Sequence, residues 1–268
     1  KALSIFEDTD GRAIKITLDT KFKGNKKDWE RTGERNQRWE MANKKKPRKF
    51  KKPVYVKYTF KLNDFPIHPA VGGSFFQVIA NKGNSRLLPW MKLEYRGNSV
   101  VHQLNFTKEV FYLKGDPENS NFDKISYKFP LGTVDQFKNY RTVSFKILAS
   151  KEDNGEIIAW VDNKKVFEVY GSNFTIGNGY TFKWGFYRWL KDAFLNETPT
   201  QSLTVKEFGF SDKCEEILDQ DKCSYTSKSK ESVSYVRYRK SSYRMPTYGK
   251  KITKSIKWTK PLPEIKIN

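Results

Sequence analysis

"PVYVKYTFKLN", residues 53–63, alternates apolar and polar side chains along its length. One parity is entirely apolar: Val54, Val56, Tyr58, Phe60 and Leu62. The other parity is mostly polar and carries two lysines. Because successive side chains of a β-strand point to opposite faces, this period of two predicts a strand with one buried face and one solvent-exposed face.

The same signal recurs along most of the chain. Strand-like patterns occupy residues 12–22, 74–80, 91–106, 142–150, 155–170, 180–189 and 201–212. Only 192–197 and 214–221 are candidate helices, and both are short. Many strands separated by turns are typical of two stacked sheets. We therefore predict an all-β fold, a β-jelly roll sandwich of two antiparallel sheets with a concave substrate groove.

The C-terminal end differs in composition from the rest of the chain. Residues 224–268 contain twelve lysines and arginines but two glutamates, interleaved with aromatic residues. We predict a jelly-roll domain over residues 1–223 and an extension over 224–268 that packs on the same domain. Residues 44–52 hold seven basic residues in nine, which suits either a nucleic-acid patch or a solvated loop before a strand.

The 268-residue chain has a net charge of +21, from 51 lysines and arginines against 30 acidic residues. A field of this strength favours a polyanionic partner, and nucleic acid, anionic lipid and acidic polysaccharide all qualify. We find no run of about 18 apolar residues, so we expect no membrane span. The chain starts at Lys1 without an apolar signal segment, and we expect that an N-terminal piece has been removed.

The two cysteines, Cys214 and Cys223, lie close together in "CEEILDQDKC". Their spacing does not suit zinc, and the two histidines, His68 and His102, lie far away in the sequence. We predict a disulfide between the two cysteines and expect no metal site. A disulfide implies an oxidising compartment, so we expect a secreted, periplasmic or otherwise extracellular protein.

Three short strings follow one another along the chain: "RWEM" (38–41), "FFQV" (75–78) and "FKWGFY" (182–187). Their order and spacing resemble the jelly-roll polysaccharide lyases, which include the alginate-lyase, glucuronan-lyase and heparin-lyase-like families. Alginate lyases carry R-S/T-E-L, Q-I/V-H and Y-F-K-x-G-x-Y strings, and looser relatives end in K-x-G-x-Y-R. The resemblance spans roughly residues 12–212, and "KWGFYR" matches the last string well.

The resemblance implies roles for individual residues. Arg38 takes the place of the family's arginine and Glu40 that of the neighbouring acid. Gln77 takes the place of the glutamine that contacts the uronate carboxyl group. The family's lysine and catalytic tyrosine fall on Lys183 and Tyr187. The chain departs from the alginate pattern at Ile79, where that family has histidine, which favours a relative that uses tyrosine or a histidine from elsewhere.

The chemistry of such a lyase suits these residue types. The enzyme removes the proton at C5 of a uronic acid and expels the sugar linked at O4. Arg38 and Gln77 can stabilise the carboxylate as charge builds on it. Tyr187 can act as base, and also as acid, if nearby Lys183 and Arg188 lower its pKa.

Imidazole titrates near neutrality, so His68 or His102 can supply the missing acid or base. Both histidines can equally be ordinary surface or hydrogen-bonded residues. The reaction needs no cofactor; a structural calcium ion is compatible with the sequence, but no motif indicates one.

Side-chain parity sorts the last string into two faces. Lys183, Gly185 and Tyr187 share one face, and the glycine leaves room there for a sugar ring. The other parity is expected to be core, although we keep Trp184 and Arg188 as candidate substrate contacts at the groove edge. Three further residues share one strand face and either line the groove or form a solvated face: Lys92, Glu94 and Arg96.

We therefore predict a monomeric polysaccharide lyase that cleaves a uronate-containing polymer such as glucuronan, ulvan, alginate or a heparin-like chain by β-elimination. The alternative is a non-catalytic, lectin-like module that binds acidic glycans, which the missing histidine favours. A nucleic-acid-binding role is a third interpretation. Neither zinc spacing, an RNA-recognition string nor a helix-turn-helix pattern supports it.

Overall fold

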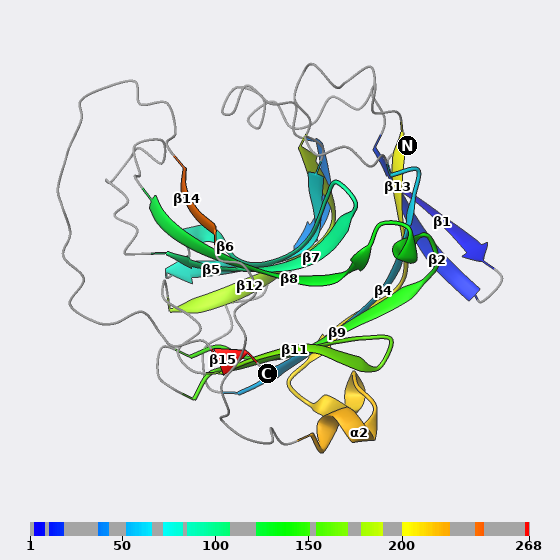
Figure 1. Cartoon of the computed structure of the whole chain (residues 1–268). Coiled ribbons are helices and arrows are strands. Elements are labelled where there is room, and N and C mark those ends of the chain that lie inside the picture. The colour runs from blue at the N-terminus through cyan, green and yellow to red at the C-terminus, as the bar shows by residue number, and fades with distance from the viewer. Residues whose placement is uncertain are drawn as a thin grey trace.

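The structure is a computed structural model of the whole chain (Figure 1). It describes residues 3–8, 11–18, 37–42, 52–65, 72–82, 85–107, 122–150, 154–170, 178–189, 200–225, 239–243 and 266–267. These residues form two antiparallel sheets, so the predicted jelly-roll sandwich is confirmed.

The first sheet has eight strands. In spatial order they are β1 (Leu3–Asp8), β2 (Gly11–Leu18), β13 (Gln201–Ser211), β4 (Val54–Asn63), β9 (Arg141–Leu148), β10 (Glu156–Val161), β11 (Lys164–Tyr170) and β15 (Lys266–Ile267). The predicted strand over 53–63 is β4. It lies in the middle of the sheet between β13 and β9.

The second sheet has seven strands. In spatial order they are β14 (Arg239–Tyr243), β8 (Phe122–Thr133), β7 (Ser99–Thr107), β6 (Ser85–Arg96), β5 (Gly72–Lys82), β12 (Gly179–Trp189) and β3 (Gln37–Ala42). Figure 1 shows this sheet curved, with its concave side turned away from the eight-stranded sheet.

The core lies between the two sheets and is filled by the apolar parity of their strands. Val56 and Phe60 of β4 are fully buried, and they face Phe76 of β5 and Phe182 of β12. Aromatic rings meet across the interface: Phe60 lies 5.4 Å from Phe75 in a tilted pair, and Phe76 stacks on Phe145 with 6.2 Å between centroids. Burial of these large side chains is the main favourable contribution to the stability of the sandwich.

Two predicted hairpins are present. The hairpin of β10 and β11 turns at Asp162 and Asn163, which both have positive φ, as a tight turn between twisted strands requires. The hairpin of β6 and β7 turns at Gly97, with a φ of 53°.

The predicted disulfide between Cys214 and Cys223 is confirmed. It joins a 3-10 turn, η4 (Cys214–Glu216), to a short helix, α2 (Gln220–Cys223), where the sequence predicted one helix over 214–221. The bridged segment packs outside the eight-stranded sheet against Tyr55, Ile158 and Trp160. Tyr55 is therefore buried, although it belongs to the polar parity of β4. The predicted helix over 192–197 lies outside the described residues.

Two pieces of the C-terminal extension belong to the sheets. β14 pairs with β8 in the seven-stranded sheet, and β15 pairs with β11 in the eight-stranded sheet. The division into a domain over 1–223 and an extension stays a prediction. The basic stretch 44–52 lies outside the described residues except for its last residue. None of the helices in the described part of the chain has the length and apolar character needed to cross a membrane.

Candidate active site

Strand β12 brings the three sequence strings together, because it lies between β5 and β3. Lys183 pairs with Gln77 of β5, and Tyr187 pairs with Arg38 of β3. Gly185 pairs with Glu40. The alternate residues of β12 point into the core: Tyr180, Phe182 and Phe186. The candidate residues therefore lie on the opposite, concave face of the seven-stranded sheet.

The carboxylate of Glu40 is the centre of this face, and its side chain is 6% exposed. The amide of Gln77 donates a hydrogen bond from Nε2 to Oε1 of Glu40 at 2.7 Å. The ammonium of Lys183 and the guanidinium of Arg38 each lie 3.6 Å from Oε2. A nearly buried carboxylate is stable only with such partners, and in return it fixes the direction of all three donors.

Tyr187 lies beside this cluster and is half-buried. The guanidinium carbon of Arg38 lies 4.8 Å from the centroid of the Tyr187 ring, which is a cation–π contact. Arg38 thus touches both Glu40 and Tyr187. The sequence had suggested Lys183 and Arg188 as the cations near the tyrosine. The stacking of Arg38 was missed because it depends on the register of β3 against β12.

Gly185 has a structural role that differs from the one expected. Its φ is +136°, and a Cβ atom there would lie 2.3 Å from the carbonyl oxygen of Trp39 and 2.9 Å from Cα of Glu40. The pairing of β12 with β5 shifts register between Trp184 and Tyr187 at the same place. The glycine therefore allows β3 to approach β12 closely and places Glu40; that it also leaves room for a sugar ring stays a prediction.

A second charged group extends the face across β6. Gln77 pairs with Lys92, and Ser74 pairs with Glu94. The carboxylate of Glu94 is 1% exposed and lies 3.9 Å from Nζ of Lys92 and 3.7 Å from Nε of Arg96. The three residues share one strand face, as predicted, and two cations are held there by a buried acid.

Arg188 lies in the core, not at the groove edge. It is fully buried, and its Nε donates to Oε1 of Gln37 at 2.5 Å. Its Nη1 donates at 3.0 Å to Oε1 of Gln201, which belongs to the eight-stranded sheet. Gln201 also contacts the hydroxyl of Tyr95 at 3.1 Å, and burial raises the pKa of that phenol. Arg188 therefore links the two sheets and does not reach the concave face.

Trp184 likewise faces the core. Its ring stacks on Phe208 with 5.0 Å between centroids and meets Tyr58 and Trp39 edge-on. The expectation that Trp184 contacts substrate conflicts with this position, because the ring lies between the sheets.

The side chains of both histidines lie outside the described residues, so their role as acid or base stays a prediction. His68 lies outside the described residues. The backbone of His102 pairs with Leu93 and Phe129, whose side chains are buried, and the side chain of His102 is outside the description. Across the described residues, histidine, cysteine and acidic side chains form no group of three or more able to hold a metal ion.

A family model described as polysaccharide lyase matches residues 6–207. An endo-β-1,4-glucuronan lyase from the fungus Trichoderma reesei matches with a TM-score of 0.58 and 15% identity, over 79% of this chain and 87% of that chain. Alginate lyase A1-II′, of polysaccharide lyase family 7, gives 0.50 and 14% over 77% and 82%. At these identities the structural matches establish the fold. No curated protein sequence matches the chain.

Proposed function

The chain belongs to the polysaccharide lyase family, and we propose that it cleaves a uronic-acid-containing polysaccharide by β-elimination on the concave face of the seven-stranded sheet. The observation that carries this proposal is the cluster around Glu40. An arginine, a glutamine, a lysine and a tyrosine converge there from three adjacent strands.

The reaction begins with loss of the C5 proton of a uronate. The electron pair left at C5 delocalises into the adjacent carboxylate, which then carries the charge of a dianion. The C4–O4 bond next breaks, a double bond forms between C4 and C5, and the leaving oxygen takes a proton. Donors aimed at the carboxylate lower this barrier most, because charge builds there in the transition state.

Arg38 and Gln77 are the donors that suit the substrate carboxylate. Arg38 is 31% exposed, so its guanidinium can reach a sugar while one side contacts Glu40. Gln77 already donates one amide hydrogen to Glu40, which orients the amide and leaves the second hydrogen for substrate. Glu40 is the positioning residue in this scheme.

Tyr187 is the proposed base. Its phenolate would accept the C5 proton, and its hydroxyl would return a proton to the leaving oxygen. The cation of Arg38 over the ring stabilises negative charge on the phenolate. Ile79 is apolar and buried where the alginate pattern has histidine, which supports a scheme in which one tyrosine serves as base and acid.

The substrate class and location belong to the same proposal. The charge of +21 and the paired cations at Glu94 suit a densely charged polymer such as glucuronan, ulvan, alginate or a heparin-like chain. The disulfide supports secretion. We propose that the reaction uses no cofactor, so protein treated with a chelator keeps its turnover.

The test is a panel of these four polymers, with a neutral glucan as control. Ultraviolet absorbance reports the new C4–C5 double bond, and mass spectrometry of the products distinguishes elimination from hydrolysis. We expect unsaturated products from at least one polymer. Products that carry an added water would replace elimination with hydrolysis, and tight binding without products would favour the lectin-like alternative.

A further inference from the structure

A hollow lies on the outer face of the eight-stranded sheet, on the far side of the sandwich from Glu40. It has a volume of about 370 Å³ and six lining residues, from β1, β2, β4 and β13: Ser4, Phe6, Lys15, Lys61, Asn63 and Thr204. Among these described residues there are two lysines and no carboxylate. Polymer cleavage on the concave face makes no use of this hollow.

The polar residues form a row straight across four strands. Ser4 pairs with Lys15, and Thr204 pairs with Lys15 on one side and with Lys61 on the other. Neighbouring strands lie about 4.8 Å apart, so the row from β1 to β4 measures about 14 Å. This length suits a short stretch of polymer better than a single small ion.

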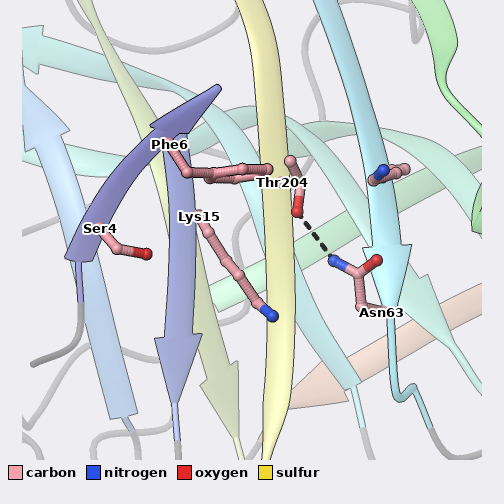
Figure 2. Close-up of a pocket in the computed structure, with 6 residues that line it drawn as sticks. Ser4, Phe6, Lys15, Asn63 and Thr204 are labelled. Carbon is pink, nitrogen blue, oxygen red and sulfur yellow. Dashed lines mark hydrogen bonds between the residues drawn. The ribbon is translucent and has the colours of Figure 1, made fainter. Parts of the chain in front are cut away.

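Phe6 forms a wall of the hollow. Figure 2 shows its ring edge-on, extending from β1 across β2 to the side of Thr204, with Lys15 below it. An aromatic ring beside polar groups offers an apolar surface to the C–H face of a sugar, while the polar groups meet its hydroxyls.

The floor of the hollow is preformed. Asn63 donates from Nδ2 to Oγ1 of Thr204 at 2.8 Å, the bond drawn in Figure 2, and to the carbonyl of Ser202 at 3.4 Å. Both bonds fix the amide, and within the described residues nothing donates to its Oδ1. That oxygen is a ready acceptor for a hydroxyl group.

The two lysines supply positive charge at separate points. Within the described part of the chain, Lys15 forms no ion pair. Nζ of Lys61 lies 4.4 Å from the ring centroid of Tyr140, and Lys206 reaches the same ring at 5.6 Å. Lys206, two residues after Thr204 on β13, thus adds a third cation beside Lys61, and this spread of charge suits carboxylates spaced along a chain.

We propose that this hollow is a second, non-catalytic binding site for an acidic polysaccharide, which holds polymer on the back of the enzyme. The identity of the ligand rests on the proposed function. A sugar chain is favoured over nucleic acid because the lining offers hydroxyl and amide partners and only two cations. Its one aromatic ring, Phe6, lies at the side of the hollow, where it cannot serve as a platform for several stacked bases.

Binding is measured on full-length Tyr187→Phe protein, in which cleavage of the probe should be slower by about 10²–10⁴. Tetrasaccharides of glucuronate and of alginate are titrated by calorimetry, and backbone-amide NMR shifts locate each site. A neutral cello-tetraose and a short single-stranded DNA serve as comparison probes. We expect two sites for an acidic tetrasaccharide, with shifts both near Gln77 and near Lys15.

Variants then isolate the hollow. Lys15→Ala should weaken the outer site about fivefold, as loss of one exposed charge contact does. Phe6→Leu keeps an apolar side chain at the edge strand and should weaken it about threefold. Lys57→Ala is the matched control, because Lys57 lies on the same face of β4 but pairs with Glu207 at 2.9 Å. It should leave the outer site unchanged.

The outcomes separate the two proposals. Shifts confined to the concave face would overturn the second site and leave the proposed function standing. Shifts confined to the hollow, together with no cleavage of any polymer by the wild-type protein, would keep the second site and remove the proposed function. The assignment of the hollow to acidic polysaccharide would be overturned if cello-tetraose bound there as tightly as the acidic probes. It would also be overturned if the DNA bound there more tightly than they do.

Discussion

Tyr187 and Arg188 are neighbours on β12, yet they lie in opposite environments. Tyr187 is half-buried on the concave face beside Arg38, whereas Arg188 is fully buried between the sheets with the amides of Gln37 and Gln201. The period of two in a strand produces this separation. Two polar neighbours in one motif can therefore have unrelated roles, one in chemistry and one in stability.

The two cationic groups differ in the kind of partner they have. On the concave face, Arg38 and Lys183 share a nearly buried carboxylate and keep part of their surface exposed to solvent. In the core, the guanidinium of Arg188 donates to neutral amide oxygens from both sheets. A cation that is to bind substrate must stay partly exposed, as Arg38 and Lys183 do and Arg188 does not.

The largest effect is expected at Tyr187. Replacement by Phe removes one hydroxyl, and if that hydroxyl transfers the proton, kcat should fall by about 10²–10⁴. KM and the unfolding midpoint should change little, because the volume and the ring are kept. Steady-state kinetics on the preferred polymer measure the loss. Tyr225→Phe is the matched control, because the Tyr225 hydroxyl donates to Glu168, outside the candidate site. A variant that keeps more than about a tenth of the turnover would remove Tyr187 as the base.

Arg188 should show the reverse behaviour. Arg188→Ala removes the guanidinium that donates to Oε1 of Gln37 and is one of two donors to Oε1 of Gln201, and loss of a buried hydrogen bond from a charged group costs about 1.5–3 kcal/mol. We expect the free energy of unfolding to fall by about 2–5 kcal/mol, measured by urea denaturation. KM of the protein that remains folded should stay the same. Unchanged stability with weaker polymer binding would place Arg188 in the site after all.

The sequence predicted the concave-face position of Tyr187 better than the core contacts of Arg188. Alternation in 53–63 and in the last string is local, so it correctly predicted strands, sheets and the face shared by Lys183 and Tyr187. Parity also placed Arg188 on the core side. Its partner Gln201 lies on the other sheet, and such a contact depends on how the sheets pack, which no local pattern records.

The same reason explains the other omissions. The contact of Arg38 with Tyr187 and the close approach at Gly185 depend on the register of β3 against β12. The outer hollow is assembled from four strands, so no single stretch of sequence indicates it. The family resemblance indicated Arg38, Glu40 and Gln77 together. The structure adds that the Glu40 carboxylate contacts both Arg38 and Gln77.

Glu40 tests whether the concave cluster depends on its central charge. Glu40→Gln keeps the shape but replaces charge-assisted contacts with neutral ones, which weakens each of them by roughly half. We expect kcat/KM to fall about tenfold through loosened Gln77 and Arg38, with a smaller effect on stability. Glu207→Gln, on the outer face beside Lys57, removes the same charge elsewhere and serves as control. Equal kinetics for the two variants would show that the carboxylate positions nothing.

The smallest effects are expected at the edge of the concave face, where Lys92 and Arg96 flank the buried acid Glu94. Arg96→Ala removes a half-exposed cation, so KM should rise about two- to fivefold at low salt while kcat stays constant. The difference from wild type should shrink as salt is added, because screening weakens the attraction of an exposed charge for a polyanion.

Lys92→Ala should raise KM by a similar factor, since Lys92 is 20% exposed and adjoins Gln77. Lys57→Ala removes an equal charge from the opposite sheet and should leave KM for soluble oligosaccharides unchanged. A fall in kcat with constant KM at Arg96 would instead extend the reacting centre to β6, and the division between chemistry near Tyr187 and binding along Glu94 would have to be redrawn.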